Sequence, residues 1–116
     1  MSNNYIKHED LIQFAQAVYE SEGVPKEDAH LAADTLVQSE LWGHPSHGLL
    51  RLSWYYARLR SVAMKPITNT TLAVDSNAIA ILDGGDGVGQ VVAKRAIEES
   101  VRRAKQHSVG TVSYTH

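Results

Sequence analysis

Two histidines, a hydroxyl side chain and an arginine fall close together within residues 43–51 of this 116-residue chain. Histidine titrates near neutral pH, so the imidazole of His47 could give a proton to a carbonyl oxygen or take one from an alcohol. The neighbouring hydroxyl of Ser46 could fix which ring nitrogen carries that proton. Arg51 follows His47 by one turn if a helix begins there, and its guanidinium could hold a carboxylate through two hydrogen bonds. These residue types suit chemistry on a small 2-oxo or 2-hydroxy acid.

The same spacing also permits simpler interpretations. His47 could cap the helix that follows and Arg51 could be a surface residue, since motifs this short often occur by chance. His44 and His47 could instead supply two ligands to a metal ion, with His116 as a remote third. Pro45 lies between the first two histidines and argues against a regular helix there, so we predict no metal site. Spacing alone favours a helix start over a catalytic run.

Segments with helical periodicity lie on both sides of the run. The first takes its apolar face from Leu11, Phe14, Ala15 and Val18, which recur at the spacing of one helical side. Trp54 and the preceding Trp42 flank the run, and we assign both to a core or an interface. The predicted helices are 8–21, 25–41, 49–59 and 88–106, and the predicted strands are 71–74, 78–82 and 110–113.

Two features of the C-terminal half bear on function. The loop 83–89 follows a strand and opens a helix, as a phosphate loop does, but it lacks the P-loop lysine and the G-x-G-x-x-G spacing. We therefore predict a turn with positive-φ positions. In the helix after it, we assign Ile97 and Val101 to the apolar face. The basic residues near its end, among them Arg103, are assigned to solvent, where they complement the helix dipole.

Composition bounds the remaining possibilities. The chain is 43% hydrophobic and 21% charged, as in an ordinary globular domain. With 11 basic and 13 acidic residues it has a net charge of −2, which argues against nucleic acid or an anionic membrane as partner. It has no cysteine, no secretory signal pattern and no apolar run near the ~20 residues that span a bilayer. We therefore predict a cytoplasmic protein that contacts neither nucleic acid nor membrane.

These segments predict an α+β fold in two parts. A helical region of about three helices covers residues 1–64 and carries the run, and a β-β-α-β unit covers residues 65–116. The last strand is rich in valine and threonine and needs partners. We expect the opening part of a larger protein, the alternative being a small complete domain whose last strand closes its own sheet.

An ordered set of motifs extends over nearly the whole chain. The triplet Ser46-His47-Gly48 is followed by Arg51, and later by Lys65-Pro66, Leu82-Asp83-Gly84 and the helix start Gly89-Gln90-Val91-Val92-Ala93. In this order the motifs resemble the N-terminal part of the malate/L-lactate dehydrogenase family, which is distinct from the Rossmann-fold enzymes. Ureidoglycolate dehydrogenase and diketogulonate reductase are among its members.

The resemblance implies hydride transfer between NAD or NADP and a 2-oxo or 2-hydroxy acid such as malate, lactate or ureidoglycolate, in a homodimer. By this resemblance His47 is the proton donor, Ser46 orients it, Arg51 holds the substrate carboxylate, and His116 is a second active-site histidine. The family's cofactor-binding region, and the aspartate of its Ser-His-Asp relay, lie beyond His116. We therefore expect the 116-residue chain to be inactive by itself.

The chain departs from the family pattern at two places. Val62 stands where many members have glycine, and residues 113–115 (Ser-Tyr-Thr) stand where many have Asn-Ser-Asn. Two other hypotheses stay open at this stage. One is a small, non-enzymatic helical interaction module that keeps the ancestral sequence, and the other is a histidine-based metal-binding protein.

Overall fold

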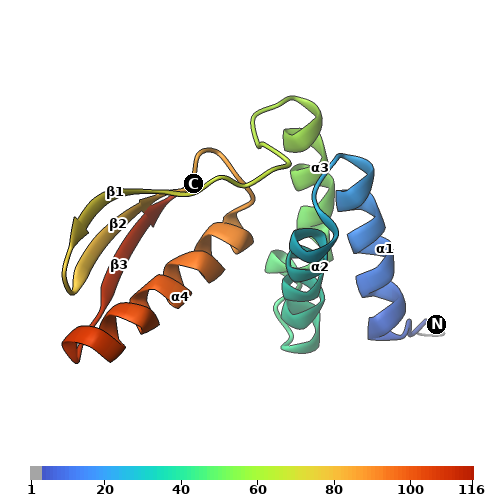
Figure 1. Ribbon diagram of the computed structural model, residues 1–116. Helices are drawn as coiled ribbons and strands as arrows, with labels where there is room; N and C mark the ends of the chain where they lie inside the picture. The colour runs from blue at the N-terminus through green and yellow to red at the C-terminus, as the bar shows by residue number, and fades with distance from the viewer. Residues whose placement is uncertain (1–3) are drawn as a thin grey trace. The chain divides into compact units, whose positions relative to one another are not determined.

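The computed structural model describes residues 4–116, so the first three residues of the predicted helical region lie outside it. The chain divides between Val62 and Ala63 into two compact units. Within residues 4–62 the first unit contains three α-helices and two 3-10 turns, and residues 63–116 form a three-stranded sheet with one long helix (Figure 1). The mixed composition confirms the predicted α+β fold.

Helices α1 (His8–Ser21) and α2 (Lys26–Leu41) pack along each other in the first unit (Figure 1). Acidic residues occupy the first turn of each, where the helix dipole favours negative charge. Alanines let the two helices approach closely. The residues buried in these helices are Ala15, Tyr19, Ala29, Ala32, Ala33, Leu36 and Val37.

The buried face of α1 differs from the predicted one in part, since Ala15 is buried as predicted and Phe14 is not. Phe14 is 61% exposed, whereas Tyr19 is 1% exposed and its ring centroid lies 6.5 Å from that of Tyr55. The periodicity of α1 fits either face, and the small side chains of α2 together with Tyr55 of α3 (Leu52–Arg60) select the one with Ala15 and Tyr19. Burial also raises the pKa of the Tyr19 hydroxyl above its ordinary value.

A strained residue follows α3. Val62 has φ 63°, in the left-handed region where a β-branched side chain is disfavoured. A glycine at this position would adopt the same conformation without strain.

The sheet of the second unit has the order β1-β2-β3. Strand β1 (Thr71–Ser76) pairs antiparallel with β2 (Ile79–Asp83), and β3 (Thr111–Thr115) pairs parallel with β2. Helix α4 (Gly89–His107) connects β2 to β3 and packs against one face of the sheet (Figure 1). Leu82 on β2 meets Val92 and Ala96 of α4 in the core, with Val112 of β3 beside them.

Several predicted boundaries shift by one to three residues. The hairpin turn was predicted over residues 75–77, but β1 continues to Ser76, which pairs with Ile79. Asn77, with φ 51°, takes the left-handed position of this shorter turn. No helix among residues 4–116 is both long enough and apolar enough to cross a membrane.

Arg103 is buried, contrary to the prediction that it faces solvent. It is 2% exposed, and its guanidinium donates to the Asp75 carboxylate at 2.6 Å, to Glu99 at 2.8 Å and to the Asn77 carbonyl at 2.7 Å. The side chain therefore ties the end of α4 to the β1–β2 hairpin. Hydrogen bonds from Arg102 and Arg103 hold the pKa of Glu99 below its ordinary value.

The predicted apolar face of α4 is wrong at two positions. Ile97 and Val101 were predicted to be buried but are 66% and 48% exposed. They point away from the side of α4 that faces the sheet, which carries the buried side chains of Val92 and Arg103.

Replacing Val62 with glycine is expected to stabilise the protein. Removing the strain of a valine held in the left-handed conformation stabilises the folded state by roughly 1–2 kcal/mol. The greater conformational freedom of glycine in the unfolded chain offsets part of this gain. We expect Val62→Gly to raise the free energy of unfolding by about 0.5–1 kcal/mol in urea titrations. A lower value for Val62→Gly than for Val62→Ala would contradict the strain at this position.

Removing the Arg103 guanidinium is expected to destabilise the second unit. Removal of this buried side chain takes the donor away from Asp75 and from the Asn77 carbonyl. Glu99 keeps its pair with Arg102, and Asp75 can regain water. We expect Arg103→Ala to cost about 2–3 kcal/mol. Arg102→Ala is the matched control, since its side chain is 51% exposed and its pair with Glu99 is worth less than about 1 kcal/mol. Equal losses of stability in urea titrations of the two variants would refute the structural role of Arg103.

Candidate active site

The run 43–51 is built from two short turns rather than one helix. After α2 ends, the His44 N–H donates to the Ser39 carbonyl at 2.8 Å. Two 3-10 turns follow, η1 (Pro45–His47) and η2 (Leu49–Arg51), and η2 continues into α3. The predicted helix 49–59 is thus wrong in its first turn, which is 3-10, and the break at Gly48 separates His47 from Arg51.

A carboxylate from α2 holds the start of η2. The Leu49 N–H donates to Glu40 Oε1 at 2.9 Å, which satisfies a donor at the positive end of the η2–α3 segment. Gly48 is buried against the same side chain. Since no side chain of the run makes a capping hydrogen bond, the interpretation of His47 as the cap of this helix is wrong. Sequence reasoning missed Glu40 because only the folded turn brings it to Leu49.

His47 is oriented by its neighbour. Ser46 Oγ lies 3.0 Å from His47 Nδ1, and both side chains are exposed. No hydrogen-bond partner of Nε2 occurs among the described residues. When Nδ1 carries a hydrogen and donates to the serine oxygen, Nε2 keeps a lone pair that can accept a proton from an alcohol. The geometry therefore fits proton exchange at Nε2.

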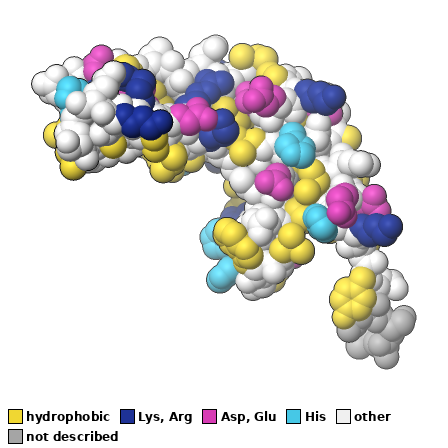
Figure 2. Space-filling view, turned by 60° about the horizontal axis from the view of Figure 1, so that its bottom comes forward, with side chains coloured by type: hydrophobic (Ala, Val, Ile, Leu, Met, Phe, Trp, Pro, Cys, Tyr) yellow, Lys and Arg dark blue, Asp and Glu magenta, His cyan; other side chains and the backbone are white. Residues whose placement is uncertain are grey.

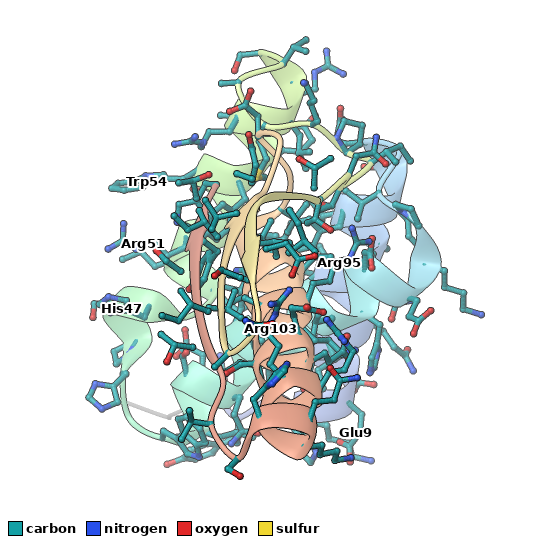
Figure 3. The ribbon with its side chains drawn as sticks, turned by 60° about the vertical axis from the view of Figure 1, so that its left-hand side comes forward. Glu9, His47, Arg51, Trp54, Arg95 and Arg103 are labelled. Atoms are coloured by element: carbon teal, nitrogen blue, oxygen red, sulfur yellow. The ribbon has the colours of Figure 1, made fainter. Side chains whose placement is uncertain are left out.

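Arg51 is fixed by two contacts and is half-buried. Its Nε donates to the Ser46 carbonyl at 2.8 Å, and its Cζ lies 4.5 Å from the centroid of the Trp54 ring. Within the described part of the chain, its terminal nitrogens Nη1 and Nη2 have no hydrogen-bond partner. His47, Arg51 and Trp54 project from the same side of the first unit (Figure 3). A free guanidinium end of this kind can bind a carboxylate in a bidentate manner.

The two tryptophans do not lie in a core. Trp42 and Trp54 are 72% and 62% exposed, so neither is buried in a core of the described residues, and the alternative expectation of an interface stays a prediction. Trp54 lies three residues after Arg51, the spacing that places side chains on one helical face, and this signal could have paired the two residues.

His116 belongs to the second unit. Its carbonyl accepts a hydrogen bond from the Asp86 N–H at 2.9 Å, and its ring stands edge-on to that of Tyr114, with centroids 6.0 Å apart. The ring also lies beside Gly89, at the start of α4. The structure thus brings Ser46, His47 and Arg51 together in the first unit and places His116 in the second.

The glycine-rich loop before α4 is a turn, as predicted. Gly85 and Asp86 have φ values of 59° and 60°. Each backbone N–H from Gly84 to Val88 already donates within the unit, to Thr115, Asp83, His116, Gly84 and Thr68 in that order. A phosphate loop needs free amides, so this loop does not fit the diphosphate of a dinucleotide.

Charged side chains elsewhere pair with each other. Lys94 pairs with Glu98 and Arg102 with Glu99 along α4, and side chains of both signs adjoin on the surface in Figure 2. This arrangement confirms a solvated face for Arg102. Over residues 4–116 no group of three or more histidine, aspartate or glutamate side chains could hold a metal ion.

Comparison with known proteins places this geometry in context. The sequence model of the malate/L-lactate dehydrogenase family matches residues 6–116. The L-sulfolactate dehydrogenase of Methanocaldococcus jannaschii is 40% identical over 91 residues, which cover 78% of this chain and 26% of that protein. The malate dehydrogenase of Pyrococcus horikoshii is 33% identical over 114 residues, which cover 97% of this chain and 32% of that protein.

Solved structures show the same fold. The sulfolactate dehydrogenase of Methanocaldococcus jannaschii superposes with a TM-score of 0.90 at 36% identity, over 94% of this chain and 32% of that chain. The malate dehydrogenase of Pyrococcus horikoshii superposes with a TM-score of 0.88 at 30% identity, over 99% of this chain and 36% of that chain. The chain therefore spans about a third or less of the length of the curated relatives it matches.

Adding a methyl group at Gly48 is expected to displace the Glu40 carboxylate. A Cβ at this position would lie 2.7 Å from Glu40 Cδ and 2.8 Å from its Cγ, too close for either to stay. We expect Gly48→Ala to lower the free energy of unfolding by about 1–2 kcal/mol, as the loss of a cap does.

The double variant Gly48→Ala/Glu40→Ala separates this clash from other effects of the substitution. It should be no less stable than Glu40→Ala alone, because the clashing side chain is gone. Additive losses in urea titrations would show that Gly48 is required for a reason other than its contact with Glu40.

Proposed function

Because the chain belongs to the malate/L-lactate dehydrogenase family, we propose that it supplies the proton-transfer and carboxylate-binding groups of a 2-hydroxy acid dehydrogenase. The observation that carries this proposal is the linked arrangement of Ser46, His47 and Arg51. The serine hydroxyl orients the imidazole and the serine carbonyl orients the guanidinium. The outward atoms of both groups, Nε2 and the two terminal nitrogens, are left for a ligand.

His47 acts as the acid when a 2-oxo acid is reduced and as the base when a 2-hydroxy acid is oxidised. In reduction, imidazolium Nε2–H gives its proton to the carbonyl oxygen as that oxygen becomes an alkoxide. In oxidation, Nε2 takes the proton of the substrate hydroxyl. Nδ1 keeps its hydrogen in both directions and donates it to Ser46 Oγ, which fixes the tautomer.

Arg51 holds the substrate by its carboxylate. Its two free terminal nitrogens match the two oxygens of that group, and a bidentate pair fixes the orientation of the 2-oxo or 2-hydroxy carbon beside it. Holding the reacting carbon in one place contributes to the rate because the reaction then requires less ordering. This role suits monocarboxylates such as lactate and dicarboxylates such as malate equally, since both carry the same 2-hydroxy acid group.

A nicotinamide nucleotide, NAD or NADP, supplies or accepts the hydride in this chemistry. The backbone N–H groups of residues 84–88 are already bonded and do not fit its diphosphate, so we assign no cofactor-binding role to these residues. We further propose His116 as a second active-site residue, and a cytoplasmic homodimer as the working form of the complete protein. The family membership supports the second histidine and the homodimer.

Removing the imidazole of His47 tests the proposal. In the complete protein we expect His47→Ala to lower kcat by about 10²–10⁴, the usual contribution of a general acid–base group, with a much smaller change in KM. His44→Ala is the matched control, because that exposed histidine lies in the same run and its side chain takes no part in the Ser46–Arg51 arrangement.

Steady-state kinetics with L-malate and L-lactate would measure both variants. If kcat is unchanged in His47→Ala, or falls equally in His44→Ala, the assignment of His47 is wrong.

A further inference from the structure

We infer that Trp54 is a positioning residue for the substrate carboxylate, acting through Arg51. Its indole face holds the guanidinium in the plane that presents Nη1 and Nη2 outward. The inference rests on the proposed function, because it adds a residue to the same carboxylate site.

The guanidinium of Arg51 is restrained at two different places. The hydrogen bond from Nε to the Ser46 carbonyl, at 2.8 Å, fixes one edge of the group. A single bond of this kind leaves the plane free to rotate about it. The indole fixes that plane, since Cζ lies 4.5 Å from the ring centroid, well inside the ~6 Å range of a cation–π contact.

Packing of α3 does not account for Trp54. The residues that α3 buries are Leu52 and Leu59, whereas Trp54 is 62% exposed. Within the described part of the chain, the indole is therefore not held by the packing of α3 and is available to the guanidinium. The contact that the structure gives it is the one with Arg51, on the side of the unit where His47 also projects (Figure 3).

Fixing the guanidinium in advance affects binding rather than proton transfer. A free arginine side chain loses rotamer freedom when it clamps a carboxylate, and a stacked one has already lost it. Loss of Trp54 should therefore weaken substrate binding and raise KM. Since the imidazole of His47 is oriented by Ser46 and not by the indole, kcat should not change.

Trp54→Leu in the complete protein tests this inference by steady-state kinetics with L-malate and L-lactate. We expect KM to rise about two- to fivefold, the effect of losing an exposed cation–π contact, with kcat unchanged. Trp54→Phe keeps an aromatic face and should raise KM less. Trp42→Leu is the matched control, because Trp42 is 72% exposed in the same unit and makes no cation–π contact among the described residues.

A double-mutant cycle decides whether Trp54 acts through Arg51. In an Arg51→Ala background, Trp54→Leu should raise KM no further, since the group that it positions is gone. An equal rise in both backgrounds would overturn the inference, as would a fall in kcat with KM unchanged or a KM that Trp54→Leu does not alter.

A binding measurement separates this inference from the proposed function. If the complete protein oxidises neither acid, the proposed substrates are wrong, and titration with oxamate followed by NMR decides the role of Trp54. We then expect saturable shifts of the Arg51 Nε–H and Trp54 indole N–H signals, with two- to fivefold weaker binding in Trp54→Leu. The absence of a shift at Arg51, or equal affinity in Trp54→Leu, would refute the inference.

Discussion

The hydrogen bond between the Glu40 carboxylate and the Leu49 N–H determines where the reactive run lies in the first unit. It joins the last turn of α2 to the start of η2, so the segment between them, which includes η1, is fixed at both ends. Ser46, His47 and Arg51 all lie on that segment or at its edge, and their mutual contacts depend on its path. A hydrogen bond of the same kind occurs in the second unit, where Thr68 Oγ1 accepts from the Val88 N–H at the start of α4. In both units a helix start is satisfied by a side chain from another part of the chain.

Local patterns were sufficient to predict much of this fold. Helix 8–21 agrees with the predicted range because its apolar periodicity and its acidic first turn lie within the segment itself. The start of the helix after Gly48 could not be predicted in the same way, because its cap comes from Glu40, outside the segment. The buried faces were uncertain for a related reason. Periodicity in α1 fits a face with Phe14 or a face with Tyr19, and the partner helix decides between them. Arg103 was assigned to solvent because its burial depends on a carboxylate and a turn carbonyl from the β1–β2 hairpin.

In the candidate site, too, some features follow from local sequence and others depend on contacts in the folded chain. Residue type and spacing made Ser46, His47 and Arg51 candidates, because all three lie within one short run, but spacing alone favoured a helix start and the family resemblance was needed to assign their roles. Trp54 was assigned to a core or an interface by residue type, and its exposure and its contact with the Arg51 guanidinium are properties of the folded chain. The glycine-rich loop shows the reverse case, since its composition suggests a phosphate site and its hydrogen bonds exclude one. Whether amides are free or already bonded is a property of the folded loop, which composition does not record.

Ser46 serves its two neighbours through different parts of the residue. Its hydroxyl contacts His47, whereas its backbone carbonyl contacts Arg51. Every amino acid has a carbonyl, so a substitution at this position can alter proton transfer while the anchor of the guanidinium is retained. In the course of evolution, the strength of the acid and the recognition of the carboxylate can therefore change independently, although both depend on one residue.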